Sequence, residues 1–305
     1  MEKNLFNILR ELEKNTPIDK LAYACHIIDD VVNTGIESLL KGNYIKNSQK
    51  GFELTGKGQS FLQKYKADFA IIMAAGSGDR LNPVTIDTPK PLVKVHGITM
   101  IEYMIETLKS AGIDNIYVVT GYKAGMFAFL ADKYDDLTLI NNDLYKNANN
   151  STTIYTVKDL LKKGKNFYIC EADHIVTDPS FLNKYVNQNQ YLAKFIAGET
   201  DEWTFDVEND RITQIKIGGC NALNMVGITF WLAETAAYLA DALEDLYKKN
   251  PNAKMLHWDV VLNMHLNDIS LGYQEVYPDQ IFEIDTFDEL IATDNSYLVY
   301  NKHGD

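Results

Sequence analysis

Residues 71–97 read IIMAAGSGDRLNPVTIDTPKPLVKVHG. An apolar run typical of a buried strand stops at residues 74–76, which are Ala, Ala and Gly. Small residues there let a flat base or a phosphate approach the backbone, and glycines such as Gly78 can turn N–H groups toward an anion. Arg80 and Lys90 could then neutralise a triphosphate. The stretch therefore predicts a ligand site at the carboxyl end of a strand in an open α/β sheet.

Strand-like and helix-like segments alternate over most of the chain. The segments 69–75, 115–121 and 166–173 have the short apolar runs of buried strands, and helical periodicity lies between them. Short connections between such elements predict a doubly wound, mostly parallel sheet. Residues 191–231 are richer in strand-forming residues, with a hairpin turn expected at 208–210, so we expect a mixed sheet.

Residues 1–66 have a different pattern. It predicts three helices, two short strands around a polar turn and a closing helix capped by Thr55, an order that resembles a winged helix-turn-helix domain. The expected positions are 5–12, 17–25 and 28–41 for the helices and 43–55 for the strands. We therefore expect two domains, residues 1–66 and residues 67–305.

The charge of the chain limits its partners. The net charge is −13, whereas residues 1–66 carry 10 Lys and Arg against 8 Asp and Glu. A protein whose main part is this acidic is a poor general binder of nucleic acid. The expected helix 28–41 has three acidic residues and only Lys41 as a base, so it should repel phosphates. We expect this domain to serve dimerisation or regulation, and DNA binding through Lys46 and Lys50 stays open.

The amino-acid composition also indicates the cellular compartment of the protein. No apolar run is long enough to span a membrane, and the N-terminus lacks the uninterrupted apolar core of a signal peptide. The three cysteines, Cys25, Cys170 and Cys220, are far apart and without CxxC spacing. That pattern is typical of reduced thiols, so we expect a cytoplasmic protein without a membrane anchor.

Paired acidic residues follow two strands. Glu171 and Asp173 alternate at the end of the strand 166–173, and Glu283 and Asp285 alternate just before an expected helix. Alternating residues of a strand project to the same side, where two carboxylates repel each other unless a cation separates them. Hard oxygen ligands beside a phosphate substrate favour Mg²⁺. The alternative for Asp285 is that it caps the helix that begins at residue 286 or 287.

The string A-A-G-x-G-x-R-L…T-P-K-P-L, with Leu92 and Gly97 beyond it, resembles the signature of the nucleotidyltransferase superfamily of sugar-nucleotide pyrophosphorylases and cytidylyltransferases. The resemblance implies that this loop wraps the nucleoside triphosphate, with Arg80 on the pyrophosphate and Lys90 near the α-phosphate. It also implies that Asp173 and Asp285 bind Mg²⁺. The implied nucleotide-binding loop residues are Ala74, Ala75, Gly76, Ser77 and Gly78.

Residues 147–161, NANNSTTIYTVKDLL, are similar to the asparagine-rich stretch of bacterial CTP:phosphocholine cytidylyltransferases. The resemblance implies that Asn149, Asn150 and Ser151 read cytosine, whereas the alternative is ordinary helix capping by Asn150 or Ser151. It covers about residues 67–295. Two histidines depart from that family: His174 stands where it commonly has asparagine, and His257 where it has tyrosine.

Three aromatic and acidic patches carry the same resemblance. All three tryptophans of the chain lie in them, and two have acidic neighbours. Aromatic faces and negative charge hold a quaternary ammonium, which cannot donate strong hydrogen bonds. The alternative is that the tryptophans are core residues. The expected acceptor-binding residues are Glu202, Trp203, Trp231, Trp258 and Asp259.

Together these features predict an Mg²⁺-dependent cytidylyltransferase that transfers CMP from CTP to phosphocholine, giving CDP-choline and pyrophosphate. The alternative acceptors are phosphoethanolamine, 2-aminoethylphosphonate and a sugar phosphate. A second hypothesis is a transcription regulator that senses a nucleotide through an inactive catalytic domain. The expected partners are CTP and a small amino-alcohol phosphate, and a homodimer stays open.

Overall fold

The computed structural model describes residues 1–49 and 51–303, so Lys50, one of the two bases considered for DNA binding, lies outside the described residues. The chain divides into two units. The first comprises Met1–Lys66 together with the short segment Tyr185–Asn187, and the second comprises Ala67–Lys184 and Gln188–Asp305. The boundary after Lys66 lies where the sequence pattern changes, whereas the assignment of residues 185–187 to the first unit was not predicted.

The first unit has the predicted order of elements. Its elements are α1 (Lys3–Glu13), α2 (Ile18–Cys25), α3 (Asp29–Lys41), β1 (Ile45–Ser48), β2 (Gly51–Leu54) and α4 (Gly56–Gln63). Thr55 caps α4, because its side-chain oxygen accepts a hydrogen bond from Gly58 N at 3.2 Å. Phe6, Leu21 and Leu39 are fully buried and share one apolar cluster with Tyr185. The assignment of this unit as a winged helix stays a prediction.

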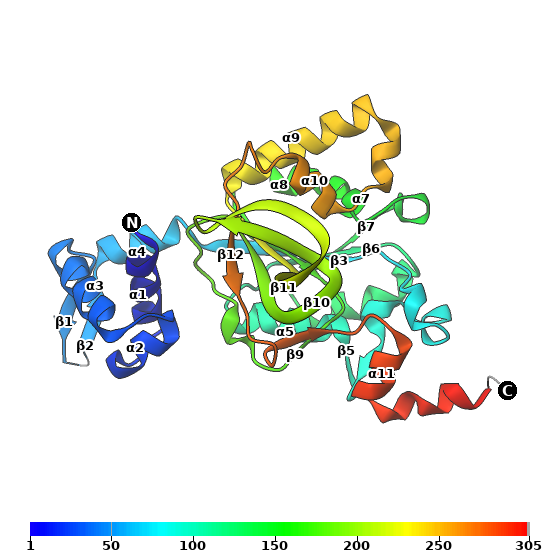
Figure 1. Ribbon diagram of the computed structural model, residues 1–305, viewed down its shortest axis with the longest axis horizontal. Helices are drawn as coiled ribbons and strands as arrows, with labels where there is room; N and C mark the ends of the chain where they lie inside the picture. Colours follow the sequence, from blue (N-terminus) through cyan, green and yellow to red (C-terminus); the bar gives the residue numbers. More distant parts are fainter. Residues whose placement is uncertain (50, 304–305) are drawn as a thin grey trace. The chain divides into compact units, whose positions relative to one another are not determined.

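The second unit is built on a mixed sheet of seven strands (Figure 1). The order across the sheet is β12-β10-β11-β8-β3-β6-β7. The strands are β3 (Ala67–Ala74), β6 (Ile116–Thr120), β7 (Leu137–Asn141), β8 (Asn166–Glu171), β10 (Gln190–Glu208), β11 (Arg211–Trp231) and β12 (Gly272–Glu275). Parallel pairs join β8, β3, β6 and β7, and β11 pairs with β8 and β10 in the antiparallel sense. The predicted fold class is therefore confirmed.

Helices cover the sheet. The helices of the second unit are α5 (Met100–Ser110), α6 (Ala128–Lys133), α7 (Ser151–Thr156), α8 (Lys158–Leu161), α9 (Ala233–Lys249), α10 (Trp258–Met264) and, away from the sheet, α11 (Phe287–Thr293). Figure 1 shows α8, α9 and α10 on one side of the sheet and α5 on the other. The main apolar cluster packs sheet residues such as Phe167 and Ile169 against Leu239 of α9 and Val261 of α10. The helix predicted after Asn150 is broken at Val157 into α7 and α8.

Two features shape the region around the site. The long strands β10 and β11 meet at Asn209 and Asp210, which have φ values of 51° and 60°, so the predicted hairpin turn is confirmed. Two small antiparallel pairs lie beside the main sheet: β4 (Lys94–Val95) with β5 (Ile98–Thr99), and β9 (His174–Val176) with β13 (Ile281–Glu283). Among the described helices, none has the length and apolar character needed to cross a bilayer.

Candidate active site

A cavity of about 730 Å³ opens at the carboxyl ends of β3 and β8, within the second unit. Most of the residues singled out from the sequence line it, although they come from widely separated parts of the chain. Those residues are Ala74, Ala75, Gly76, Gly78, Arg80, Lys90, Asn149, Asn150, Asp173, Glu202, Trp203, Asp259 and Asp285. The cavity is also lined by Glu171 and Glu283, the other members of the two acidic pairs, and by Tyr191 and His257, which were not predicted as site residues.

The loop after β3 forms one wall of the cavity. Gly78 has a φ of 73°, in the left-handed region that glycine adopts without strain. A Cβ atom at this position would lie 2.4 Å from the Cβ of Lys90, so a side chain here would displace that lysine. The glycine is therefore required both for the turn and for the approach of Lys90 to the cavity.

Lys90 lies between two carboxylates. Its Nζ is 2.7 Å from Asp173 Oδ2 and 2.7 Å from Asp285 Oδ1, while Arg80 Nη2 is 2.6 Å from the same Asp285 oxygen. Burial favours the neutral amine, but the charges of Asp173 and Asp285 prevail and raise the pKa of Lys90 above its ordinary value. The charged form of Lys90 is therefore favoured, and its ammonium group bridges Asp173 and Asp285, the two acids that were predicted to act together.

Carboxyl groups outnumber basic groups at this end of the cavity. Carboxylate oxygens of Glu171, Asp173 and Glu283 lie within 4.8 Å of one another. Burial and the neighbouring acids raise the pKa values of Glu171 and Glu283 well above their ordinary range. Asp173 Oδ1 is buried and has no hydrogen-bond partner among the described residues. This all-oxygen set fits a hard cation such as Mg²⁺.

Two alternatives concern residues beside these acids. Thr286, not Asp285, caps α11, because Thr286 Oγ1 accepts from Glu289 N at 3.2 Å, so the Asp285 carboxylate can face Lys90. His174 is buried behind Asp173, with its Nδ1 3.6 Å from Asp173 Oδ1, and it is outside the cavity lining. Burial lowers the pKa of His174, which favours an uncharged ring.

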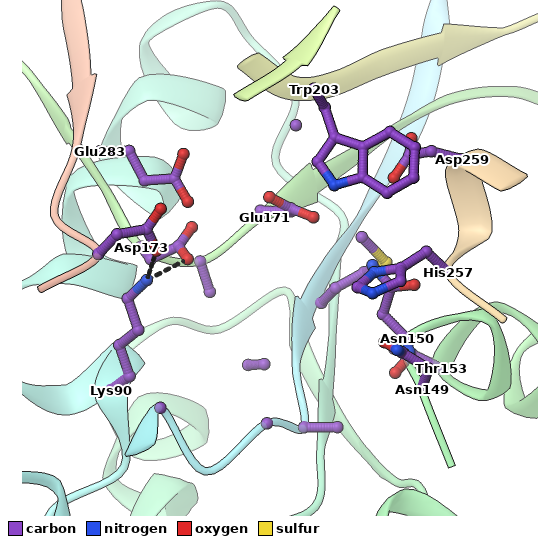
Figure 2. A pocket seen from close by; sticks show the side chains of 18 of the residues that line it. Lys90, Asn149, Asn150, Thr153, Glu171, Asp173, Trp203, His257, Asp259 and Glu283 are labelled. Carbon is purple, nitrogen blue, oxygen red and sulfur yellow. Dashed lines mark hydrogen bonds and ion pairs between the residues drawn. The ribbon is translucent and has the colours of Figure 1, made fainter. Parts of the chain in front are cut away.

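The opposite end of the cavity combines aromatic rings with carboxylates (Figure 2). The rings of Trp203 and His257 lie 5.6 Å apart at 52°. Asp259 is only 7% exposed, and Tyr191 Oη donates a hydrogen bond to its Oδ1 at 3.0 Å. Burial raises the pKa of Asp259, and the hydrogen bond from Tyr191 opposes part of that rise. In Figure 2, Glu171 lies between this end and Asp173.

The expectation that Trp231 and Trp258 bind the acceptor is wrong. Both are core residues, 1% and 2% exposed, and their rings pack edge to face at a centroid distance of 6.5 Å. Trp231 Nε1 donates to Thr229 Oγ1 at 2.7 Å inside this core. Neither ring lines the cavity, because the apolar cluster of α9 and α10 surrounds both.

Two serines also lie apart from the cavity lining. Ser151 is fully buried, and its Oγ is hydrogen-bonded to Tyr247 Oη at 2.7 Å, which joins α7 to α9. Ser77 belongs to the loop after β3 but is not among the cavity residues. The side chains that face the cavity from these two segments are instead those of neighbours such as Asn149, Asn150 and Arg80.

Comparisons with known proteins agree with this geometry. Residues 69–207 match the sequence model of the family described as nucleotidyl transferase. A 2-aminoethylphosphonate cytidylyltransferase of Lancefieldella rimae is 38% identical over 230 residues, which cover 75% of this chain and 93% of that protein. A choline-phosphate cytidylyltransferase of Streptococcus pneumoniae is 32% identical over 218 residues, covering 71% and 93%.

A solved structure has the same fold over the same share of the chain. The structure of the CTP:phosphocholine cytidylyltransferase from Streptococcus pneumoniae superposes with a TM-score of 0.68 at 29% identity, covering 75% of this chain and 98% of that one. These relatives agree with the family predicted from the sequence. The chain therefore belongs to the nucleotidyl transferase family, and it is a cytidylyltransferase, an enzyme that uses CTP.

Proposed function

We propose that the enzyme transfers CMP from CTP to the phosphonate group of 2-aminoethylphosphonate and releases pyrophosphate. The observation that carries the choice of acceptor is the composition of the cavity end at Trp203. Of the three tryptophans only Trp203 lines the cavity, and the carboxyl groups of Glu202 and Asp259 line it too. A primary ammonium donates three hydrogen bonds and needs oxygen acceptors, whereas a quaternary ammonium needs mainly aromatic faces. Asp259 and Glu171 would supply those acceptors.

The relatives support the same choice. The 2-aminoethylphosphonate enzyme of Lancefieldella rimae shares 38% of aligned residues with this chain, and the choline-phosphate enzyme of Streptococcus pneumoniae shares 32%. Phosphocholine is the second candidate, since a trimethylammonium group could lie against Trp203 and His257. A sugar phosphate is less suited to this end, because buried carboxylates favour a cation over a neutral ring.

The reaction would need little proton transfer. The acceptor oxygen, already ionised, attacks the α-phosphorus of CTP while the bond to the β-phosphate breaks and pyrophosphate leaves. Ala74–Gly76 and Asn149 would contact the nucleoside, and Arg80 would hold the leaving pyrophosphate. Lys90 would neutralise charge that develops around the α-phosphorus.

Mg²⁺ is part of this proposal. Asp173 and Asp285 would hold it, and Asp173 Oδ1, which is buried without a hydrogen-bond partner among the described residues, supports a cation there. When bound, the ion would polarise phosphate oxygens and neutralise their charge. Positioning of the two phosphorus groups in line would come from the basic residues and from the acidic end that holds the acceptor's ammonium.

The intact set of basic and acidic residues favours an active enzyme over a transcription regulator with an inactive catalytic domain. For the first unit we propose dimerisation or regulation, since α3 carries Asp29, Asp30 and Glu37 against Lys41. A cytoplasmic location fits the scattered cysteines. A gel-shift experiment at stated salt would test DNA binding separately.

The deciding experiment measures pyrophosphate release from CTP with Mg²⁺ and each of four acceptors: 2-aminoethylphosphonate, phosphoethanolamine, phosphocholine and glucose 1-phosphate. We expect the highest kcat/KM with 2-aminoethylphosphonate. A preference for phosphocholine of about tenfold or more, which corresponds to about 1.4 kcal/mol, would move the assignment to the second candidate. Activity with the sugar phosphate alone would contradict both.

A further inference from the structure

The loop that carries Asn149 and Asn150 is hydrogen-bonded to the segment that enters α10. That segment contributes His257 and Asp259 to the end of the cavity proposed to bind the acceptor, called the acceptor end below. Asn149 N donates to the carbonyl oxygen of Lys254 at 2.8 Å. Asn150 Oδ1 accepts from the backbone N of Trp258 at 2.7 Å. Both asparagines line the cavity, and both partners belong to the segment that enters α10. These contacts therefore link the proposed nucleotide side of the cavity to its acceptor side.

The second of these bonds has a structural consequence for α10. Trp258 is the first residue of this helix, and its N-cap His257 provides no side-chain hydrogen bond. The first backbone N–H groups of a helix have no partner within the helix. Asn150 satisfies that of Trp258 from a different loop. This hydrogen bond thereby fixes the residue at which α10 begins, and with that start it fixes the position of the adjacent Asp259.

The positions of the side chains near the start of α10 depend on the residue at which the helix begins. The Trp258 ring packs in the core against Trp231, whereas the next residue, Asp259, faces the cavity. His257, one residue earlier, contacts Trp203. A shift of the helix start would therefore move both His257 and Asp259 relative to Trp203.

We propose that Asn150 is a positioning residue for the acceptor, and that it transmits contacts from the nucleotide loop to the acceptor end through Trp258 N. The inference rests on the proposed function, because it assigns Asp259 and His257 to the acceptor. It differs from a role in reading cytosine, because the amide oxygen of Asn150 is already used within the protein. Binding of CTP and of the acceptor should then favour each other reciprocally.

Two substitutions test this role. Asn150→Ala removes the acceptor oxygen, whereas Asn150→Asp keeps an oxygen that can accept from Trp258 N. A matched control is Asn189→Ala, because Asn189 Oδ1 accepts from Leu232 N at 2.8 Å, at the start of α9 and outside the cavity lining. All three proteins would be full length, and a shared loss of fold would show in their circular dichroism.

Three measurements apply to each protein. Hydrogen exchange of residues 256–264, without ligands, reports on the start of α10. Calorimetry gives the Kd for CTP alone. Steady-state kinetics at saturating CTP gives the KM for whichever acceptor the wild type uses best, so the test does not depend on which amino-alcohol phosphate or phosphonate that is.

We expect Asn150→Ala to speed hydrogen exchange at residues 256–264. It should raise the acceptor KM about tenfold, because one buried hydrogen bond is lost. The Kd for CTP should stay within about twofold of the wild-type value. Asn150→Asp should restore both properties, and Asn189→Ala should leave the acceptor KM unchanged. The inference is wrong if Asn150→Ala weakens CTP and spares the acceptor, or if exchange at residues 256–264 does not change. A wild type that uses none of the amino acceptors would instead contradict the proposed function, whatever the exchange result.

Discussion

The hydrogen bond between Tyr191 and Asp259 leads to a prediction about pH. Tyr191→Phe removes only the hydroxyl group that donates to Asp259 Oδ1 at 3.0 Å, and both side chains are buried. Burial raises the pKa of Tyr191 well above its ordinary value, so in the wild type this hydroxyl stays protonated and donates at every working pH. The substitution therefore changes the protonation equilibrium of the Asp259 carboxyl group and leaves the shape of the cavity nearly unchanged.

The size of the effect follows from the charge of Asp259. Burial raises the pKa of this carboxyl, while the Tyr191 hydrogen bond and the nearby His257 lower it. A hydrogen bond to a charged group contributes about 1.5–3 kcal/mol, so its loss should raise the pKa of Asp259 further.

The direction of the effect on activity is fixed by the role of Asp259. The carboxylate would hold the acceptor's ammonium only when ionised, so kcat/KM for the acceptor falls as pH drops through the pKa of Asp259. In Tyr191→Phe that pKa is higher. The acidic limb of the profile should therefore move to higher pH, with a much smaller loss on the alkaline plateau.

The assay compares kcat/KM for 2-aminoethylphosphonate between about pH 5 and 9 in the two proteins, because the acceptor's own ionisation is common to both. Tyr238→Phe is the matched control: Tyr238 Oη donates to Asp268 Oδ2 at 2.9 Å on the exposed side of α9. It should leave the profile in place. If the wild-type and Tyr191→Phe profiles superimpose, Asp259 does not bind the acceptor as an anion, and the reasoning fails.

Four further substitutions test the rest of the site. Trp203→Leu keeps apolar bulk but removes the π face, so the acceptor KM should rise about two- to thirtyfold while the Kd for CTP stays constant, and equal loss for both ligands would argue against the assignment. Asp173→Asn and Asp285→Asn should each lower turnover by about a hundredfold or more; either residue that keeps near-normal Mg²⁺-dependent activity is not a metal ligand. Lys90→Met should lower kcat more than CTP affinity, and a defect confined to the KM for CTP would place Lys90 elsewhere.

The part of the site at the ends of β3 and β8 was predictable from the sequence. A glycine loop after an apolar strand and a pair of alternating acids each mark a strand's carboxyl end, and such ends meet at one edge of a parallel sheet. Lys90, Asp173 and Asp285 indeed converge there within 2.7 Å contacts. The loop 147–150 was found only through resemblance, because asparagines before a helix are equally common as caps.

The tertiary partners were not predictable in the same way. Tyr191 and Asp259 are 68 residues apart in sequence, and only the packing of α10 against the sheet brings them together. Tyr185 shares a core with the first unit for a similar reason. Such pairs depend on how elements dock, and local periodicity carries no information about that.

Trp258 shows why an acidic neighbour is a weak sign of a cation site. Successive residues of a helix point about 100° apart, so a helix that turns Asp259 toward the cavity turns Trp258 into the core. Trp203 is different, because β10 has irregular pairing between Thr200 and Trp203, and both Glu202 and Trp203 line the cavity.

Two tryptophans near the acceptor end, Trp203 and Trp258, therefore have different roles. The ring of Trp258 anchors α10 in the core, and the helix in turn presents Asp259 to the cavity, where the Tyr191 hydroxyl holds its carboxylate. Asn150 fixes the start of that helix from the nucleotide side. Selectivity for the acceptor's ammonium would then depend on Trp203 directly and on Trp258 only through the position of Asp259.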